Sequence, residues 1–473
     1  MTVIEVEDLS VFAGATRLLG PVSFRIARGG VLVVMGETGA GKSLIAQAIL
    51  GTLPGALSFR GRIAINGQRV DTLPAADRAR LWGRDLASLP QEPWRALDPL
   101  MAAARQVSET HRHVGGLPVA EAAAATARDF ARLGLDPGER RLPGALSGGM
   151  AQRVAFAAAT AGGAPILLAD EPTKGLDHDR QARVIGLLAE VARAGGTLMA
   201  ITHDAQVAEA LGGTLVVLRN GRVVEQGATA QVLQAPQDPY TKALLAADPS
   251  AWPVLPAAEP GDLMLRAQGL AVSRGGPRLF AGIDLAIHAG ARLAITGPSG
   301  VGKSTLLDAL LGLIPPDEGR VERAGLLGRH AIQKLYQDPP AAFPPFGRLE
   351  TSFRDVARRH AAAWETVLGY LEDLTLSPTL LQRRPDAVSG GELQRLSLAR
   401  ALIVGPRVLL ADEPTSRLDP ITQKTTLDLL HKVSLETGIA VVLVTHSAAI
   451  AERWADEVLH LTPGHEKAEK AIG

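Results

Sequence analysis

The sequence predicts an α/β protein of two tandem phosphate-loop nucleotide-binding domains, each with a mixed or parallel sheet core and a helical subdomain. Three observations support this prediction. The pattern G-x-x-x-x-G-K-[ST] occurs twice, at Gly36–Ser43 and at Gly297–Ser304. Each loop follows an apolar segment typical of a buried strand, Val31–Met35 in the first copy and Arg292–Thr296 in the second. The motifs after each loop recur in the same order, so the repeat covers a whole domain of alternating strands and helices.

Each phosphate loop can hold a triphosphate, because its glycines let backbone N–H groups surround the β-phosphate at a helix N-terminus. The lysine is expected to reach the β- and γ-phosphates, and the serine hydroxyl to bind Mg²⁺. A chance glycine loop is the alternative, and two full matches after strands argue against it. The predicted nucleotide-binding residues of the loops are Gly36, Glu37, Thr38, Gly39, Ala40, Gly41, Lys42 and Ser43, then Gly297, Pro298, Ser299, Gly300, Val301, Gly302, Lys303, Ser304 and Thr305.

An acidic pair ends an apolar strand in each copy, Asp170-Glu171 in the first and Asp412-Glu413 in the second. The carboxyl ends of strands are where α/β folds place ligand chemistry. We expect the aspartate to join the Mg²⁺ shell and the glutamate to orient or deprotonate the attacking water. A solvated pair at a strand end is the alternative, but it does not explain why the pair recurs after a phosphate loop and a Ser-Gly-Gly segment.

A glutamine and a histidine also follow strand-like segments in both copies. The histidines lie at nearly the same distance after the acidic pair, which favours a γ-phosphate-sensing role over a merely structural one. The glutamine amide can touch both Mg²⁺ and the water. The predicted catalytic residues are therefore Glu171, Glu413, His203, His446, Gln91 and Gln337. The predicted Mg²⁺ ligands are Ser43, Gln91, Asp170, Ser304, Gln337 and Asp412.

Two stretches fall outside these motifs. Residues 99–141 are rich in Ala, Arg and Leu around the turn Gly115–Pro118, which predicts a helical subdomain. Residues 248–261 contain four prolines and favour a stiff, extended connector over structure of their own. The predicted organisation is a first domain over residues 1–248, a proline-rich linker over 249–262 and a second domain over 263–473.

The composition limits the classes of function. The 473 residues include 49 Lys and Arg and 49 Asp and Glu, and a neutral formal charge argues against a nucleic-acid partner. The chain has no cysteine, which excludes disulfides and cysteine-ligated iron–sulfur clusters. Apolar runs fall well short of the ~20 residues of a membrane helix, and the first residues do not resemble a secretion signal. We expect a cytoplasmic protein that reaches a membrane only by docking.

The order of these motifs resembles that of the ATP-binding cassette (ABC) ATPases, including the Ser-Gly-Gly signature at Leu146–Arg153 and Val388–Arg395. In that family two cassettes pack head to tail, with each ATP between the phosphate loop of one and the signature of the other. The resemblance implies ATP and Mg²⁺ as ligands. It implies that the first loop shares its ATP with Ser389, Gly390 and Gly391, and the second with Ser147, Gly148 and Gly149. The segments ending at Asp177 and Asp419 would join the two sites.

The resemblance also predicts how the two sites compare. Both copies keep the lysine, serine, glutamine, signature, acidic pair and histidine, so we expect two hydrolysis-competent sites. The family usually stacks adenine on an aromatic residue upstream of the loop, and Phe12 takes that place in the first copy. The second copy has Val272–Gly276 there, where Arg274 could stack instead but no aromatic residue is present. The two sites are therefore expected to differ in nucleotide affinity.

The first copy looks like the oligopeptide, dipeptide and nickel importer group, because of Gln91–Leu100, Glu225-Gln226-Gly227 and the tail Asp238–Leu245. The resemblance implies two different membrane-spanning permease subunits, a periplasmic or extracellular solute-binding protein, and a peripheral position on the cytoplasmic face of the inner membrane. The second copy departs from the group, with a proline-rich Gln337–Phe346 and no such tail among its residues.

Two alternatives stay open at this point. The chain could be the ATPase of a phosphonate-cleaving (carbon–phosphorus lyase-like) complex, whose cassettes resemble those of the dipeptide importers. It could also be a soluble twin-cassette ATPase acting on ribosomes, although such proteins carry a long charged helical linker. For an importer, the residues do not identify the solute; peptides, nickel chelates and similar small polar solutes remain possible.

Overall fold

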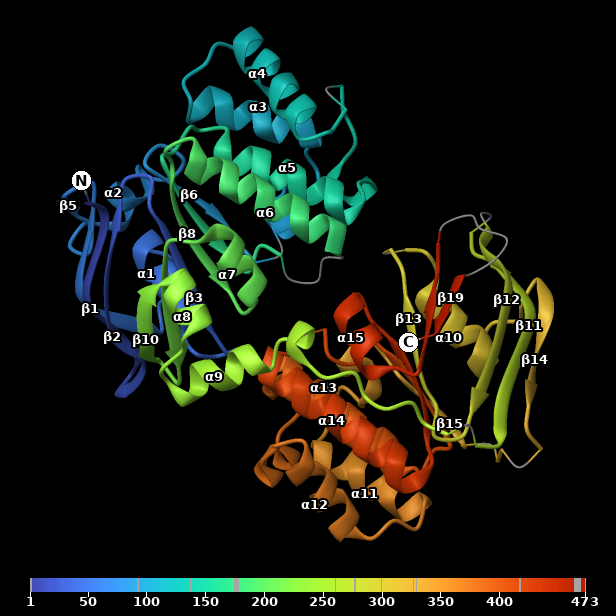
Figure 1. The fold of residues 1–473 in the computed structure, drawn as a ribbon. Coiled ribbons are helices and arrows are strands. Elements are labelled where there is room, and N and C mark those ends of the chain that lie inside the picture. The colour runs from blue at the N-terminus through green and yellow to red at the C-terminus, as the bar shows by residue number, and fades with distance from the viewer. Residues whose placement is uncertain are drawn as a thin grey trace. The chain divides into compact units, whose positions relative to one another are not determined.

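The computed structural model describes residues 2–91, 93–136, 138–173, 178–259, 261–275, 278–298, 300–325, 327–328, 330–416, 418–462 and 469–472. The chain forms two compact units, Met1–Ala246 and Ala247–Gly473, each with its own sheets, helices and hydrophobic cores (Figure 1).

The centre of the first unit is a six-stranded sheet with the order β10-β9-β3-β8-β7-β6. Neighbouring strands are parallel from β9 to β6, and β10 pairs antiparallel at the edge. Parallel strands are buried on both faces, so they appear as continuous apolar runs in the sequence. The bounds are β3 (Val31–Gly36), β6 (Leu86–Leu89), β7 (Ile166–Asp170), β8 (Thr197–Thr202), β9 (Thr214–Arg219) and β10 (Arg222–Ala228).

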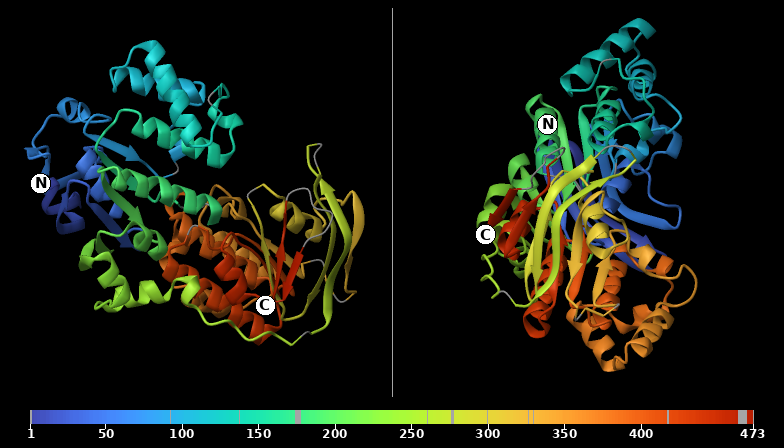
Figure 2. Two further views of the ribbon diagram at one scale, coloured as in Figure 1. Left: turned by 45° about the horizontal axis from the view of Figure 1, so that its top comes forward. Right: turned by 90° about the vertical axis from the view of Figure 1, so that its right-hand side faces the viewer.

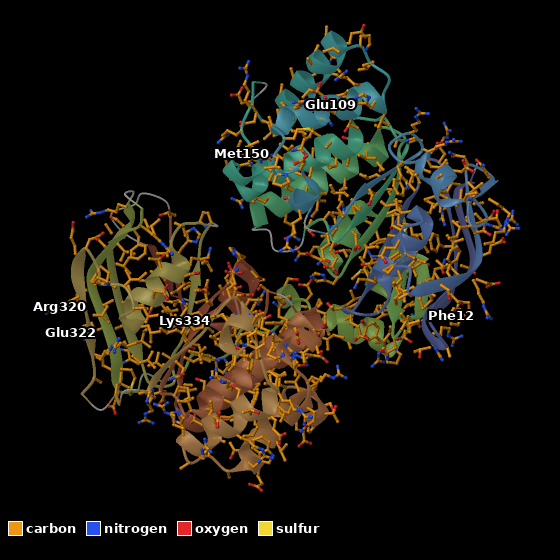
Figure 3. The ribbon with its side chains drawn as sticks, turned by 180° about the vertical axis from the view of Figure 1, so that it is seen from behind. Phe12, Glu109, Met150, Arg320, Glu322 and Lys334 are labelled. Atoms are coloured by element: carbon orange, nitrogen blue, oxygen red, sulfur yellow. The ribbon has the colours of Figure 1, made fainter. Side chains whose placement is uncertain are left out.

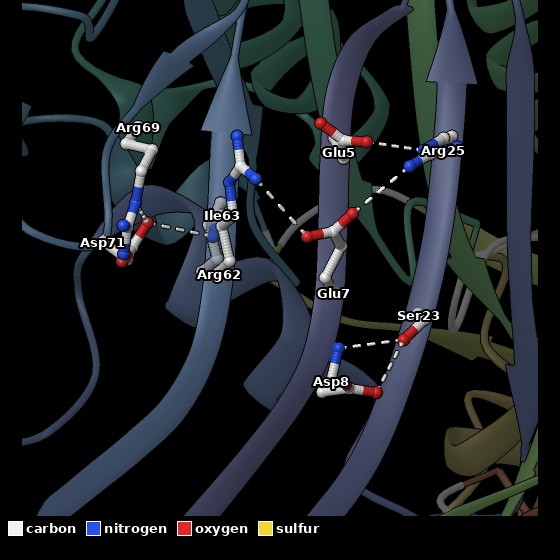
Figure 4. A network of polar contacts seen from close by, with 9 residues as sticks. All are labelled: Glu5, Glu7, Asp8, Ser23, Arg25, Arg62, Ile63, Arg69 and Asp71. Carbon is white, nitrogen blue, oxygen red and sulfur yellow. Dashed lines mark hydrogen bonds and ion pairs between the residues drawn. The ribbon is translucent and has the colours of Figure 1, made fainter.

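A four-stranded antiparallel sheet, β2-β1-β4-β5, packs through helix α1 (Lys42–Leu50) onto one face of the central sheet. Ile4 of β1, Ile45 of α1 and Val34 of β3 belong to this one core. On the other face of β1, Glu7 bonds to Arg25 and Arg62 (Figure 4), and such exposed pairs contribute little stability. The strands are β1 (Thr2–Ala13), β2 (Thr16–Ala27), β4 (Leu57–Ile65) and β5 (Gln68–Arg69).

Helices cover the opposite face of the central sheet, where Val154 of α5 and Leu188 of α6 join a core with Leu167 and Leu198. The helical subdomain, α3 and α4, stands outside this layer in cyan in Figures 1 and 2. The helices are α2 (Ala75–Ala79), α3 (Ala103–His113), α4 (Val119–Arg132), α5 (Gly148–Thr160), α6 (His178–Arg193), α7 (Ala205–Leu211), α8 (Thr229–Gln234) and α9 (Pro239–Ala246), with 3-10 turns at Pro93–Ala96 and Pro143–Ala145.

The second unit repeats this plan with a six-stranded sheet, β15-β16-β17-β13-β18-β19, and a three-stranded antiparallel sheet, β12-β11-β14. The central strands are parallel from β15 to β18. The bounds are β11 (Leu263–Ser273), β12 (Arg278–His288), β13 (Arg292–Thr296), β14 (Glu318–Arg323), β15 (Ile332–Leu335), β16 (Val408–Asp412), β17 (Ala440–Val444), β18 (Glu457–His460) and β19 (Glu469–Ile472).

In this unit α10 (Lys303–Leu311) packs between the two sheets, and α11 (Leu349–Arg359) with α12 (Trp364–Asp373) forms the helical subdomain. The remaining helices are α13 (Gly390–Ile403), α14 (Pro420–Thr437) and α15 (Ala448–Trp454), with 3-10 turns at Pro249–Ala251, Pro339–Ala342, Pro378–Gln382 and Pro385–Ala387. The α/β class, the mixed sheets and the helical subdomains are as the sequence predicts. Among the described helices, none combines the length and apolar character needed to cross a membrane.

The connector between the copies belongs to the second unit. Trp252 is buried in that unit's core, and the Leu255 N–H donates to the Arg453 carbonyl at 2.9 Å. The N–H of Ala258 donates to Asp456 at 3.0 Å. We expected a connector without structure of its own, but its apolar residues and backbone groups fasten it to α15 and to Asp456, the residue before β18. The domain limits at residues 248 and 262 stay a prediction.

Candidate nucleotide sites

The first phosphate loop connects β3 to α1 and is closed by its own lysine. The Lys42 Nζ is buried and donates to the carbonyl oxygens of Gly36 and Glu37, each at 2.8 Å. Gly36 has a φ of 152°, and an added Cβ would lie 2.2 Å from the Leu218 carbonyl oxygen, so no side chain fits. Helix α1 begins at Lys42, directly after Gly41. Gly41 has a left-handed φ of 92°, and this turn directs the chain into the helix, whose first N–H groups have no partner within the helix.

The second loop has the same backbone form between β13 and α10. The Lys303 Nζ donates to the carbonyl oxygens of Gly297 at 2.8 Å and Pro298 at 2.9 Å. Gly302 precedes the helix with a φ of 105°. Thr305 is buried in the first turn of α10. Ser299 lies outside the described residues.

The catalytic candidates come together around one glutamate in the first unit. The Glu171 carboxylate lies 3.4 Å from the Gln91 amide nitrogen, 3.5 Å from His203 Nδ1 and 3.8 Å from Lys42 Nζ. Glu171 is buried directly after β7, beside Asp170, and its φ of 44° lies in the left-handed region. Such backbone strain in a non-glycine residue is frequent at functional sites.

In the second unit the same residues lie closer to one another. The Glu413 carboxylate lies 2.9 Å from the Gln337 amide nitrogen and 2.5 Å from His446 Nε2. Its φ is 49°, so the strain also recurs. Burial would raise the pKa of Glu413, but His446, Lys303 and Gln337 outweigh it and hold the pKa below its ordinary value. Glu413 is therefore a carboxylate, the form that a base requires.

The surroundings of Asp412 are suited to a cation ligand. Burial raises the pKa of its carboxyl group, while a hydrogen bond from Ser304 and the charge of Lys334 oppose the rise. Its Oδ1 is buried without a hydrogen-bond partner in the described part of the chain. A buried carboxylate oxygen of this kind is stabilised by a hard cation such as Mg²⁺. Ser304 and Gln337 supply the other predicted oxygen donors at this site.

One buried lysine near the second site went unnoticed in the sequence. Lys334 lies on β15 (Figure 3), and its side chain is 4% exposed. Its Nζ lies 2.6 Å from Asp308 Oδ1 and 3.7 Å from Asp412 Oδ2. The paired register of the strands gives Ser88 as its counterpart in the first unit. The signal that could have found it is a lysine within the strand that leads to the predicted Mg²⁺ ligand Gln337, three positions before that glutamine.

The signature segments begin α5 and α13. The Ser147 hydroxyl accepts from the Met150 N–H, and Ser389 forms a reciprocal capping box with Glu392. The first helical residues are glycines, Gly148 and Gly149 in one unit and Gly390 and Gly391 in the other, so their N–H groups are not covered by side chains. Each helix is also bonded at or just after its acidic pair, since Gln152 donates to the carbonyl of Pro172, the residue after Glu171, at 2.7 Å and Gln394 donates to the Glu413 carbonyl at 3.0 Å.

Phe12 lies on β1 (Figure 3) and is half-buried. The Arg60 guanidinium carbon lies 5.3 Å from its ring centroid. One side of the ring is thus occupied by a cation. In the second unit Arg274 is exposed on the bend after β11. Adenine stacking at either place stays a prediction, and Asp177 lies outside the described residues.

The family model described as "ABC transporter" matches the chain over residues 19–174 and 280–416. The chain belongs to the ABC transporter family. Each match contains the phosphate loop, the glutamine, the signature and the acidic pair of one unit, so the chain carries two ATP-binding cassettes.

Curated relatives match along both cassettes. The peptidoglycan transport ATP-binding protein YejF of Agrobacterium fabrum is 32% identical and covers 98% of this chain and 91% of its own length. The glutathione import ATP-binding protein GsiA of Salmonella typhi is 31% identical, covering 92% of this chain and 80% of its own length. An ABC transporter ATP-binding protein YejF of Escherichia coli is 32% identical over 98% of this chain and 94% of its own length.

Solved structures give the same architecture. One described as RNase-L Inhibitor covers 98% of this chain and 90% of its own, with a TM-score of 0.69 and 19% identity. An archaeal ribosome recycling factor, aABCE1, crystallised with a ribosomal stalk protein, covers 94% of this chain with a TM-score of 0.67 and 19% identity. At this identity the likeness shows the fold alone.

Proposed function

We propose that this ABC transporter chain is the ATP-hydrolysing motor subunit of an importer, with both cassettes on one polypeptide. The observation that carries the proposal is the similarity along both cassettes to relatives named for peptidoglycan transport and glutathione import. The importer-type tail of the first cassette, Asp238–Leu245, supports it. Both named solutes contain peptide bonds, so a peptide is the first solute to test, before nickel chelates and similar small polar compounds.

Each unit carries the groups that hydrolysis of ATP needs. In the first unit Lys42 would leave the loop carbonyls and neutralise the β- and γ-phosphates of the substrate. Glu171 would accept a proton from the attacking water, oriented by Gln91 and His203. Glu413, Gln337 and His446 would do the same in the second unit.

Mg²⁺ would neutralise phosphate charge when bound. We propose that Ser43, Gln91 and Asp170 hold it in the first unit, and Ser304, Gln337 and Asp412 in the second. The buried, unpartnered Oδ1 of Asp412, within the described residues, supports this assignment.

We further propose that the two cassettes close head to tail on ATP. The uncovered glycine N–H groups at the signature helices would then bind the phosphates held by the phosphate loop of the other cassette. Asp177 and Asp419 would lie on the segments that join the two sites. Cross-linking of cysteines introduced at Ser43 and Gly390 tests this, since ATP should increase the yield only if the loop and the signature meet.

The proposed partners are two different permease subunits and a solute-binding protein, with this chain peripheral on the cytoplasmic face of the inner membrane. The different sequences after Gln91 and Gln337 motivate the two permeases. The test is ATPase activity of the chain reconstituted with its candidate permeases in vesicles, with and without the binding protein and a peptide. Solute-dependent stimulation supports the importer; failure to bind or respond to any permease contradicts it.

The alternatives are less well supported. The likeness to the ribosome recycling factor extends only to the fold. The connector of this chain is short and rich in proline. No observation favours a phosphonate-cleaving complex over an importer. Co-purification with lyase subunits instead of permeases would reverse that preference.

A further inference from the structure

The tail of the first cassette is bonded to its phosphate loop. Tyr240, the second residue of α9, is 4% exposed, and its hydroxyl oxygen accepts a hydrogen bond from the Glu37 backbone N–H at 2.8 Å. The two residues are 203 positions apart in sequence. Glu37 is also the residue whose carbonyl oxygen accepts from Lys42. Glu37 is therefore held at both of its backbone groups. Its N–H donates to Tyr240 of the tail, and its carbonyl oxygen accepts from Lys42 of the loop.

Tyr240 is itself held by neighbouring elements. The Arg219 guanidinium carbon lies 4.9 Å from the tyrosine ring centroid, and Arg219 ends β9, the strand beside β3. The N–H of Tyr240 donates to Asp238 Oδ1 at 2.8 Å, which fixes the start of the helix. A ring packed in this way places its hydroxyl with little loss of side-chain entropy when the bond forms.

A carboxylate on β10 anchors the segment before this helix. Glu225 accepts from the N–H groups of Gln237 at 2.8 Å and Asp238 at 3.1 Å. Burial would raise the pKa of Glu225, but these N–H groups, the Thr241 hydroxyl and the charge of Lys242 together lower it below its ordinary value. The carboxylate that holds the helix start therefore stays ionised at neutral pH.

The second phosphate loop cannot form a corresponding hydrogen bond. Its residue at the position of Glu37 is Pro298, which has no N–H to donate. The flanking glycines nevertheless have similar φ values, 152° and 140° at Gly36 and Gly297. Both loops hold their lysine through the carbonyl of this residue. The proline ring fixes φ covalently, and the tyrosine bond restrains the peptide N–H at the same place.

We propose that Tyr240 is a positioning residue for the first nucleotide site, which restrains the phosphate loop at Glu37 as the ring of Pro298 restrains the second loop. The inference rests on the proposed ATP sites and adds that the importer-type tail tunes one of them. Because Pro298 lacks the donor altogether, this N–H is not one that a phosphate loop of this chain needs for its ligand. Tyr240 therefore acts through the loop and not on the nucleotide.

The test measures binding of ATP with Mg²⁺ to the full chain, with the second site weakened by Lys303→Ala. Tyr240→Phe keeps the ring and removes only the hydroxyl. We expect about 3- to 10-fold weaker ATP binding at the first site, the range of one net hydrogen bond. In the chain with both loop lysines intact, the hydrolysis rate at saturating ATP should change less than twofold on Tyr240→Phe, because the hydroxyl does not touch the reacting atoms. Tyr370→Phe, a half-buried tyrosine of α12, is the matched control and should change neither quantity.

Rescue separates positioning from a general structural role. Glu37→Pro supplies the covalent restraint found in the second loop, so Tyr240→Phe with Glu37→Pro should bind ATP within twofold of the unsubstituted first site. Binding unaffected by Tyr240→Phe, or a loss that Glu37→Pro does not restore, overturns the inference. In that case, ATP binding by the otherwise unchanged chain would still support the proposed function. If that chain also failed to bind ATP, the proposed function itself would fail.

Discussion

In the first cassette Glu171 lies 3.4 Å from Gln91 and 3.5 Å from His203, whereas in the second Glu413 lies 2.9 Å from Gln337 and 2.5 Å from His446. The motif residues are the same, so the difference comes from what surrounds them. The second cassette has a lysine beside its site, Lys334, and a buried arginine at the start of β13, Arg292, which bonds to Asp456 and to the connector. The strand positions that these residues occupy are Ser88 and Val31 in the first cassette.

The comparison shows that the motif residues of a cassette can stay the same while the contacts that hold them in place differ. A phosphate loop with a glutamate base recurs with the same backbone strain in both copies. The surrounding elements use a tyrosine and a tail helix in one copy, and ion pairs and a docked connector in the other. Each prediction below changes one of these features.

The largest expected effect comes from the two glutamates. Glu171→Gln and Glu413→Gln remove the proposed base, and a general base is worth ~10²–10⁴-fold in rate. If the sites are coupled, either single change abolishes steady-state ATPase activity of the reconstituted complex, and the double change adds nothing. Glu209→Gln, an exposed position on α7, serves as the control and should leave the rate unchanged.

A near-normal rate for one of the two single variants would break the symmetry that the motifs suggest. That site would then be regulatory, and the prediction of two competent sites would be wrong. The looser contacts of Glu171 make the first site the one to examine first.

The next effect is on the stability of the second unit. Arg292 is 2% exposed; it bonds to Asp456 and to the Pro256 carbonyl of the connector, and its NH1 lies 2.7 Å from His431. Asp456→Ala leaves this buried cation without its carboxylate and should cost ~3–5 kcal/mol in the free energy of unfolding. Amide hydrogen exchange measured on peptides from a digest reports on the two units separately. In the Asp456→Ala variant, faster amide exchange should be confined to peptides of the second unit.

The matched control is Asp428→Ala, which breaks an exposed pair with Lys424. Exposed pairs contribute about 0–1 kcal/mol, so its effect should be small. Equal effects of the two substitutions would mean that the Arg292 pair contributes no more to the stability of the second unit than an exposed ion pair does.

The sequence predicts correctly that the glutamine, glutamate and histidine of each copy lie together, while their roles in hydrolysis stay a prediction. Apolar runs such as Ile166–Ala169 that end in Asp-Glu are typical of buried parallel strands with acids at their carboxyl ends, and the structure has β7 there. The glutamate, glutamine and histidine of each copy meet as that topology requires. The need for glycine in the phosphate loop also follows from the sequence pattern. The structure gives the reason at Gly36, where a Cβ would have no room beside Leu218.

The supporting contacts were not predictable, because they join residues distant in sequence. Nothing local in the tail shows that Tyr240 meets Glu37, and a proline-rich segment suggests a connector without contacts. The docking of that segment depends on Trp252 filling a core made by α14 and α15. Its backbone groups find partners in Arg453 and Asp456 only once the second unit is folded.

A smaller effect is expected at the cation site. The Lys334 charge, 3.7 Å from Asp412, opposes Mg²⁺ binding in the second cassette. Lys334→Ser with Asp308→Gln installs the residues that the first cassette has at the corresponding positions, Ser88 and Gln47. We expect roughly five- to tenfold tighter Mg²⁺ binding in the presence of ATP, because a partly screened like charge is removed.

Isothermal titration of Mg²⁺ into the ATP-loaded chain measures this change, with the first site silenced by Lys42→Ala. The single change Asp308→Gln is the informative companion, since it frees the lysine from its partner and should weaken Mg²⁺ binding instead. The same direction for both variants would show that Lys334 does not act through its charge.

The smallest effect concerns the signature helices. Ser389 and Glu392 form a capping box at the start of α13: the Glu392 carboxylate accepts from the Ser389 N–H at 3.1 Å, and the Ser389 hydroxyl accepts from the Glu392 N–H at 3.3 Å. The first cassette has only the serine cap, with Met150 in place of the glutamate. Glu392→Met therefore converts the second helix start into the first and should cost ~0.5–1 kcal/mol. Glu372→Met, at an exposed position near the end of α12, should cost less, and chemical denaturation compares the two. If the two substitutions lower the free energy of unfolding equally, the reciprocal bond of the capping box adds no stability. The starts of the two signature helices would then differ in sequence but not in stability.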